Sequence, residues 1–320
     1  MTLLLTEHDV EQLLTLELAL DCVEAAFRAL AVEGAVNHPR RRLRLNGGML
    51  HYMASLIPTQ NVFGMKIYPT GLGPTDFLIP LYDARTAKLL ALIEGDYLGQ
   101  LRTGAASGVA TKYMARDDAR VLGLIGTGGQ ARTQLLAICA VRPIERVLVF
   151  SRKPENRAEF VSAMQPHVRA SIMAVDDPRA AIEPADVVAT MTTATTPVFD
   201  GSWLAAGTHL NAAGSNHLRR REIDGATIAR CARIAADSVE QAQMECGDLA
   251  AAVAEGILKW ENVLEFADIV GGKAPGREAR EEITLFESQG LSVWDIATAA
   301  RVYELAVQRG LGQQIPLFQR

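Results

Sequence analysis

The chain has few lysines, few cysteines and no long hydrophobic run. Six lysines and four cysteines stand among its 320 residues, and the formal net charge is -5 with a pI near 5.8. Because a chain without a basic excess has no global field to attract phosphates, we do not expect a nucleic-acid partner. No segment approaches the ~18 apolar residues that a membrane-spanning helix needs, so we expect no membrane association.

The cysteines exclude two further classes of protein. They are scattered, and no CxxC pair or Cys/His cluster has the spacing of a zinc site, so we expect free thiols and no metal. The opening sequence MTLLLTEHDVEQLL carries acids where a secretory signal has a cationic start. These features predict a cytoplasmic protein.

The remaining composition is that of an ordinary globular protein. Hydrophobic residues make up 49% of the chain and charged residues 22%, which is enough apolar surface for a sizeable core. At ~150 residues per domain, the length predicts two domains.

The first third of the chain predicts helices followed by a sheet. Thr6 followed by Asp9 resembles a helix start, and the spacing of apolar residues predicts that the first ~35 residues are helical. Short segments of strand character follow, separated by turn residues, and predict a mostly antiparallel sheet; they are RRLRL, MLHYMASL, FGMKIYP, LIPLYDA and LLALIEG. Residues 101–114 then form a predicted helix.

From residue 120 the pattern changes to apolar runs that alternate with helical stretches. The runs are RVLGLIG, RVLVFSR, ADVVATMT and THLNAAGS, and a helix is predicted over residues 155–164. Buried runs between helices are typical of βαβ units, so the second domain is predicted to be a doubly wound parallel sheet. A final helix is predicted over residues 293–309, and periodicity alone assigns it no place in either domain.

A glycine-rich loop predicts a dinucleotide site. The sequence GTGGQA follows the strand VLGLI directly and opens a helix, which is the context that gives GxGxxA its meaning. Gly126 permits a tight turn, Gly128 lets the backbone approach a pyrophosphate, and Ala131 allows close packing of helix and strand. The candidate cofactor-binding residues of the loop are Gly126, Thr127, Gly128, Gly129, Gln130 and Ala131.

The end of the next strand favours NADP(H) over NAD(H). An acid at this place would hydrogen-bond the 2′-hydroxyl of the adenosine ribose, whereas small and basic residues accommodate a 2′-phosphate. This chain has Ser151, Arg152 and Lys153 there. Glu155 follows closely, and a solvated basic turn is the alternative interpretation.

Several segments together resemble the ornithine cyclodeaminase/mu-crystallin family. They run in order over nearly the whole chain and are PRRRLRL, YMAS, FGMKIYP, LRTGAASGVATKYMA, IGTGGQA, TPVFDGSWLAAGTHLNAAGSN, ECGDL and FESQGLSVWDIA. The resemblance implies an α/β protein with a Rossmann-type doubly wound dinucleotide-binding domain and an α+β substrate-binding and dimerisation domain. It implies domains at residues 1–116 and 117–298, with a C-terminal helix over 299–320 that returns to the first domain. A homodimer that acts on small amino or imino acids is implied as well.

The resemblance also implies roles for basic residues. Lys66, which by strand pattern alone is an edge or snorkelling lysine, matches the active-site lysine of the family and would contact the substrate carboxylate and transfer a proton. Arg102 would clamp the carboxylate bidentately, and Thr103 would lie beside the cofactor. The second arginine of the family falls in RRR, where we choose Arg40 with Arg41 as the alternative.

Two positions depart from the cyclodeaminases of the family. Asn216 and His51 stand where those enzymes carry acids suited to a substrate ammonium, so Asn216 is a candidate catalytic residue and His51 a candidate substrate-binding residue. An unpaired buried ammonium would cost several kcal/mol. The segments that hold Thr192, Ser288 and Gly290 would fold around the nicotinamide, and Thr192 and Gly290 are therefore candidate cofactor-binding residues. Asp295, in a similar segment, is equally interpretable as a structural acid within a helix.

These departures favour one reaction. We expect an NAD(P)H-dependent reductase of a cyclic imino acid, a pyrroline- or piperideine-carboxylate, or an amino-acid dehydrogenase, because reduction needs only a hydride and a held carboxylate. Ornithine cyclodeaminase is the alternative. A non-catalytic protein that binds NADPH and a small ligand, as in the crystallin relatives, is the alternative of another class.

Overall fold

The computed structural model describes residues 1–318, and the chain folds into two compact units. Unit 1 comprises Met1–Arg102 with Leu291–Arg320, and unit 2 comprises Thr103–Gly290. Both boundaries lie earlier in the chain than the expected 116 and 298. Of the expected C-terminal segment 299–320, residues 319 and 320 lie outside the described part.

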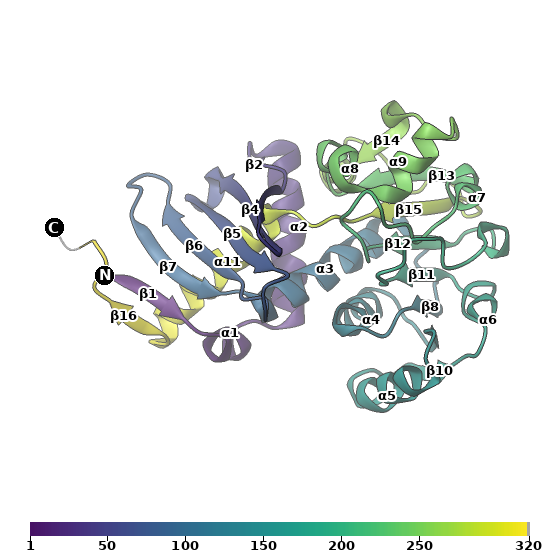
Figure 1. The fold of residues 1–320 in the computed structure, drawn as a ribbon, viewed down its shortest axis with the longest axis horizontal. Helices are drawn as coiled ribbons and strands as arrows, with labels where there is room; N and C mark the ends of the chain where they lie inside the picture. Colours follow the sequence, from purple (N-terminus) through teal and green to yellow (C-terminus); the bar gives the residue numbers. More distant parts are fainter. Residues whose placement is uncertain (319–320) are drawn as a thin grey trace. The chain divides into compact units, whose positions relative to one another are not determined.

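Unit 1 is built on a mostly antiparallel sheet with strand order β16-β1-β7-β6-β5-β4-β2, and β3 pairs with β4 (Figure 1). Strand β1 is parallel to β7, and the other pairs are antiparallel. The strands are β1 (Thr2–Leu5), β2 (Val36–Asn37), β3 (Arg41–Leu45), β4 (Gly48–Ile57), β5 (Val62–Thr70), β6 (Leu78–Asp83), β7 (Leu89–Glu94) and β16 (Gln313–Ile315). This confirms the antiparallel sheet that the sequence predicted.

Helices cover one face of this sheet. Helix α11 (Ser292–Arg309) packs against β4, β5, β6 and helix α2 (Leu16–Val32), and helix α1 (Glu7–Leu13) packs against α11 and β7. The predicted final helix thus belongs to unit 1. A short 3-10 helix, η1 (Pro58–Gln60), links β4 to β5, and α3 (Asp96–Met114) begins at the end of unit 1, earlier than predicted.

The expectation that the first ~35 residues are all helical is wrong at two places. Residues of β1 pair with β7, and this buries most of the side chains of β1. The chain is also extended at Thr15, which caps α2. The predicted start at Thr6 is confirmed, since Thr6 and Asp9 form a capping box at the head of α1.

Unit 2 is a doubly wound sheet of eight parallel strands in the order β10-β9-β8-β11-β12-β15-β13-β14 (Figure 1). The strands are β8 (Val121–Ile125), β9 (Arg146–Phe150), β10 (Ser171–Ala174), β11 (Val187–Thr190), β12 (His209–Ala212), β13 (Cys231–Ala236), β14 (Val263–Glu265) and β15 (Ile283–Glu287). Alternate residues of one strand enter different hydrophobic clusters: Leu122 and Leu124 join one cluster, Val121 and Ile125 the other. Burial on both faces is the physical reason for the continuous apolar runs in the sequence.

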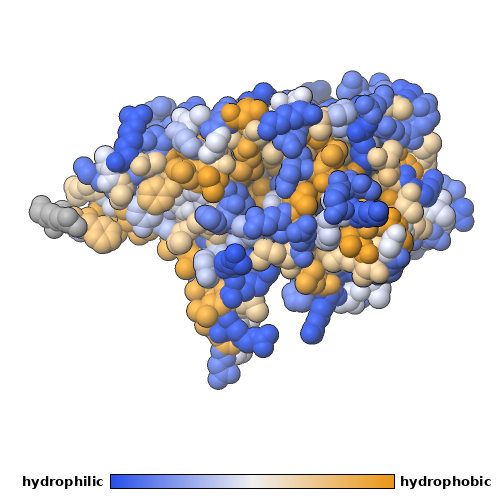
Figure 2. Space-filling model, turned by 90° about the horizontal axis from the view of Figure 1, so that it is seen from above, coloured by the Kyte–Doolittle hydropathy of each residue, from blue (hydrophilic) through white to orange (hydrophobic). Residues whose placement is uncertain are grey.

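Helices and short 3-10 turns connect these strands. The helices are α4 (Gly129–Val141), α5 (Pro154–Met164), α6 (Pro178–Ile182), α7 (Gly225–Arg230), α8 (Val239–Glu245), α9 (Gly247–Ala254) and α10 (Phe266–Val270), and the 3-10 turns are η2 (Gln165–His167), η3 (Gly201–Trp203) and η4 (Trp260–Asn262). On the surface that Figure 2 displays, hydrophobic residues gather in several groups between hydrophilic ones. Within residues 1–318, no helix is both long and apolar enough to cross a membrane.

Candidate functional site

The glycine loop of unit 2 has the geometry of a phosphate-binding turn. Gly126 follows β8 with φ of +111°, and a Cβ there would overlap the carbonyl oxygen of Met191, so only glycine fits. Gly128 is the N-cap of α4 and offers no side-chain cap to its first N–H groups. A Cβ on Gly128 or Gly129 would meet only open space. The backbone donors of the first turn are therefore accessible to an anion, as binding of a pyrophosphate requires.

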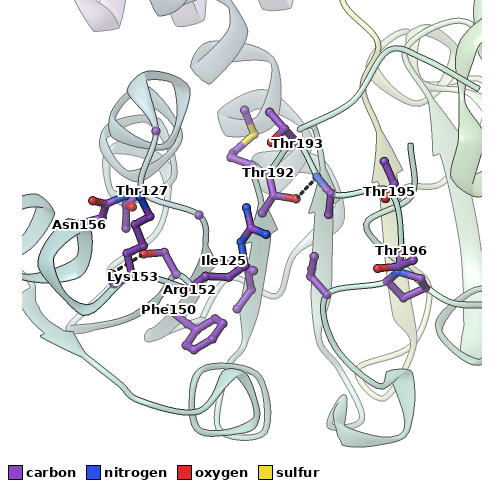
Figure 3. A pocket seen from close by; sticks show the side chains of 17 residues that line it. Ile125, Thr127, Phe150, Arg152, Lys153, Asn156, Thr192, Thr193, Thr195 and Thr196 are labelled. Atoms are coloured by element: carbon purple, nitrogen blue, oxygen red, sulfur yellow. Dashed lines mark hydrogen bonds between the residues drawn. The ribbon is translucent and has the colours of Figure 1, made fainter. Parts of the chain in front are cut away.

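A cavity of about 840 Å³ lies beside this loop, at the carboxyl ends of β8, β9 and β11 (Figure 3). Ligands of open α/β sheets bind outside the carboxyl ends of the strands where the strand order reverses, and β8 is flanked here by β9 and β11. Of the candidate residues, Gly126, Thr127, Gly128, Ser151, Arg152, Lys153 and Thr192 line the cavity. The residues present thus fit a dinucleotide.

Arg157 holds the basic turn after β9, which comprises Ser151, Arg152 and Lys153, in place. Arg157 of α5 is buried, donates to the carbonyl oxygen of Ser151 at 2.9 Å and to Asp176 at 2.5 Å, and lies over the ring of Phe150. The side chains of Arg152 and Lys153 are exposed and border the cavity, whereas Glu155 does not. The cationic side chains of Arg152 and Lys153 therefore lie at the end of the cavity that is next to β9.

Sequence reasoning missed part of the cavity lining. Asn156 lies on the same side as Lys153, and Thr193, Thr195 and Thr196 follow Thr192 along the opposite wall (Figure 3). The threonine-rich segment directly after an apolar strand was the available signal. The candidates outside the lining are Thr103, Gly129, Gln130, Ala131 and Gly290.

Unit 1 contains a separate cluster of buried charges. Lys66 lies on β5, and Gly64 and Lys66 point to the face that α11 covers. Lys66 Nζ donates to Oδ1 of Asp295 at 3.0 Å, and Arg102 Nε donates to the same oxygen at 2.9 Å. The exposed fractions are 3% for Lys66, 6% for Arg102 and 0% for Asp295. The structure thus brings together two of the candidate residues on a carboxylate whose role the sequence left open.

Burial also affects the proton affinity of Lys66. It lowers the pKa of Lys66 to about 8, with Arg102 and Arg40 acting in the same direction and Asp295 opposing them. The ring of Phe77 lies 4.6 Å from Nζ of Lys66. Within residues 1–318, Oδ2 of Asp295 is buried without a hydrogen-bond partner. A lysine with a pKa this close to neutrality is suited to donate a proton.

Arg40 directly precedes β3, and His51 lies on β4, the strand that pairs with β5. Arg40 is 4% exposed, whereas Arg41 is exposed, so Arg40 is the arginine that faces inward. His51 accepts from or donates to Thr70 Oγ1 through Nε2 at 2.9 Å and stacks on Tyr68 with 4.6 Å between ring centroids. Burial and two neighbouring arginines lower the pKa of His51 to about 4, which keeps the ring neutral at pH 7.

Asn216 lies in the segment after β12 and is half-buried. Nearby acids have structural partners: Glu222 accepts from the backbone N–H groups of Thr192 and Gly214, and Asp224 caps α7. Ser288 donates to Asp237, which also accepts from the N–H of Gly290 at 2.7 Å. These acids hold the loops at the carboxyl edge of the sheet.

The described part of unit 2 also contains a buried group of three possible metal ligands, Cys246, Asp248 and Glu287, whose ligand atoms lie within 4.8 Å of one another. Two of them accept hydrogen bonds from backbone N–H groups. Cys246 caps α9, and Asp248 accepts from the N–H groups of Glu222 and Ile223. The sequence pattern gave no sign of this group, because Glu287 comes from β15, far along the chain from Cys246 and Asp248 at the start of α9.

Comparison with known proteins agrees with this geometry. The model of the ornithine cyclodeaminase/mu-crystallin family matches residues 1–310. A Delta(1)-pyrroline-2-carboxylate reductase of Bacillus cereus is 41% identical over 239 residues, which are 74% of this chain and 73% of the relative.

Two solved structures have the same fold over nearly their whole length. The Delta(1)-pyrroline-2-carboxylate reductase of Thermococcus litoralis, in complex with NADH and L-proline, is 37% identical with a TM-score of 0.93, and the match covers 98% of this chain and 100% of that one. An archaeal alanine dehydrogenase dimer with bound NAD is 34% identical with a TM-score of 0.92 and 99% coverage of both chains.

Proposed function

The chain belongs to the ornithine cyclodeaminase/mu-crystallin family, and from that premise we propose that it reduces a cyclic imino acid, a pyrroline- or piperideine-carboxylate. It is an oxidoreductase that uses a nicotinamide dinucleotide. The observation that carries the proposal is the buried cluster of Lys66 and Arg102 on Asp295. The cluster has more cations than anions, and a carboxylate substrate without a free ammonium balances it.

The side chains that would surround the substrate have separate roles. Arg102, with Arg40, holds the substrate carboxylate, because a guanidinium meets a carboxylate in a fixed, bidentate geometry. Lys66 donates the proton that the imine nitrogen gains on reduction. The reduced nicotinamide, when bound, supplies the hydride to the imine carbon. His51 and Asn216 are neutral, so neither balances an ammonium on the substrate.

The dinucleotide would bind in the cavity of unit 2. Gly126 and Gly128 let the backbone approach the pyrophosphate, whose charge the N-terminus of α4 stabilises. Ser151, Arg152 and Lys153 would contact the 2′-phosphate, so NADPH is the preferred form. Thr192 lines the same cavity and would contact the nicotinamide half.

The protein is proposed to be a homodimer that pairs through unit 1. The register of β3, β4, β5 and β6 places Leu43, Tyr52 and Leu78 on the face turned away from Lys66, and they are 56%, 39% and 38% exposed. Exposed apolar side chains on one face of a sheet are typical of an interface. The archaeal alanine dehydrogenase is a dimer. Analytical ultracentrifugation of wild-type protein and of Tyr52→Glu tests this arrangement.

One assay tests the reaction itself. Purified protein is mixed with NADPH and a panel of cyclic imines and 2-oxo acids with ammonia, and oxidation of NADPH is followed by absorbance. The proposal expects the highest kcat/KM with a cyclic imine. Efficient formation of proline from L-ornithine would instead indicate the cyclodeaminase reaction, and binding of NADPH without turnover of any compound would indicate a crystallin-like binding protein.

A further inference from the structure

One buried acid in unit 2 joins the segments that follow β11 and β12. Glu222 is 1% exposed, and its carboxylate accepts three hydrogen bonds. The donors are Oγ1 of Thr190 at 3.0 Å, the N–H of Thr192 at 2.6 Å and the N–H of Gly214 at 2.8 Å. Two of these donors are backbone groups at the carboxyl edge of the sheet, where the dinucleotide cavity lies.

Glu222 also holds the far end of the same cavity wall. Residues 192–198 all line the cavity, and this segment begins at Thr192 and ends at Val198. The side chain of Glu222 accepts from the N–H of Thr192, and its carbonyl oxygen accepts from the N–H of Val198 at 2.9 Å. A single residue therefore fixes both ends of the wall that faces Arg152 and Lys153 (Figure 3).

Hydrogen bonds from its own backbone also fix the position of Glu222. Oδ1 of Asp248, in the first turn of α9, accepts from the N–H of Glu222 at 2.8 Å and from the N–H of Ile223 at 2.9 Å. A Cβ on Gly214 would overlap both carboxylate oxygens of Glu222, so the close approach of the two segments depends on that glycine. The arrangement leaves the carboxylate little freedom to move.

A carboxylate suits these donors better than an amide does. Two oxygens without a proton can accept all three hydrogen bonds, whereas an amide has one acceptor oxygen and turns its NH₂ group toward a donor. Burial raises the pKa of Glu222 to about 7, and the hydrogen bonds from Thr192 and Gly214 counteract that rise.

We propose that Glu222 is a positioning residue for the dinucleotide, which acts by holding the cavity wall 192–198 in the shape that the cofactor binds. Glu222 does not line the cavity, so its effect passes through Thr192 and Val198. The inference rests on the proposed function only in requiring that a dinucleotide binds there. It is independent of which imino or amino acid is the substrate.

The test compares Glu222→Gln with Glu265→Gln in the full-length protein. Glu265 is a matched control, because its carboxylate also accepts a backbone N–H, that of Val239 at 3.0 Å, but it lies outside the cavity lining. For Glu222→Gln we expect the Kd for NADPH, from fluorescence titration, to rise about tenfold or more, since the variant loses a hydrogen bond to a charged group. We expect KM for NADPH to rise in parallel, while kcat at saturating NADPH changes less than about twofold. Glu265→Gln should leave the Kd unchanged.

A merely structural role would give a different result. Both variants would then lose thermal stability while the folded protein of each bound NADPH as tightly as the wild type, and this outcome overturns the inference. If Glu222→Gln does not fold, Thr190→Val removes one donor to the carboxylate without touching the cavity. A Kd for NADPH that is raised severalfold in that variant supports the positioning role of Glu222, and an unchanged Kd contradicts it. Wild-type protein that bound neither NADPH nor NADH would overturn the proposed function and the inference together.

Discussion

Lys66 and Asp295 form an ion pair inside unit 1, with 3.0 Å between Nζ and Oδ1, although 229 positions separate them in the chain. Arg102 shares the same oxygen, so one carboxylate balances two cations. All three side chains are buried, so the attraction of Asp295 for each cation and the repulsion between the two cations are both strong. The cluster therefore keeps a net positive charge that an anionic substrate neutralises.

Replacing Lys66 by alanine should abolish turnover and spare the dinucleotide. Lys66 belongs to unit 1, whereas the glycine loop belongs to unit 2. We expect NADPH to bind the variant with wild-type affinity, while kcat/KM for the best imine falls more than about a hundredfold, the usual worth of a general acid. Retention of more than about a tenth of wild-type kcat/KM would show that the assigned role is wrong.

The activity should decline in alkaline solution. Lys66, with a pKa of about 8, must carry its proton to donate it, so kcat/KM should fall as pH rises through about 8. The protonated form is present below that value, which fixes the sign of the change. Lys66→Arg should lower kcat/KM strongly at every pH and leave no decline near pH 8, because the guanidinium keeps its proton and cannot donate it. A profile that stays flat up to about pH 10 would contradict the role of Lys66.

Removing Asp295 should destabilise the protein. Asp295→Asn leaves Lys66 and Arg102 buried without their carboxylate, and such losses cost about 3 to 5 kcal/mol. Denaturation by urea measures the free energy of unfolding. Asp268→Asn is the control, because Asp268 pairs with Lys273 on the surface, where both side chains are about half exposed, and should cost less than about 1 kcal/mol. Equal effects in the two variants would refute the importance of the buried cluster.

Arg152 should decide between the two dinucleotides. We expect NADPH to bind more tightly than NADH, and Arg152→Ala to narrow the difference by about 1 to 3 kcal/mol, the worth of a hydrogen bond to a charged group. Fluorescence titration with both cofactors provides the measurement. Arg169→Ala, an exposed arginine of unit 2 outside the cavity lining, should leave the preference unchanged. Equal or tighter binding of NADH to the wild type would overturn the preference.

L-Ornithine should be a poor substrate. Its side-chain ammonium needs an acid, and His51 and Asn216 are neutral at the two positions concerned. A cyclic imine needs no such partner, because its nitrogen already lies within the ring. Proline formed from ornithine with catalytic NAD⁺ is compared with NADPH oxidation by pyrroline-2-carboxylate, and His51→Glu with Asn216→Asp should raise any trace of the former. Glu222 and Asp224 are unsuited to replace the acids, since both bind backbone N–H groups.

Local patterns predicted most of the elements and part of the site. Strands β3 to β7 each combine strand-forming residues with turn residues at both ends, and the glycine loop lies between a strand and a helix as its spacing requires. The exposed strand β10 and the strands β13 to β15 were not identified. The wall 192–198 was missed beyond Thr192, because no spacing rule links a threonine-rich loop to a glycine loop some 60 residues earlier.

The sequence by itself determined the family, the parallel sheet with its glycine loop, and the identity of Lys66 and Arg102 as candidates, because each depends on residues close together in the chain. Tertiary structure alone decided which charges meet. Asp295 pairs with Lys66 only because α11 returns to cover β5, and Glu222 reaches Thr192 and Gly214 only because β11 and β12 are neighbours in the sheet. Desolvation and Coulomb attraction depend on distance in space, and periodicity along a chain carries no information about contacts between residues so far apart.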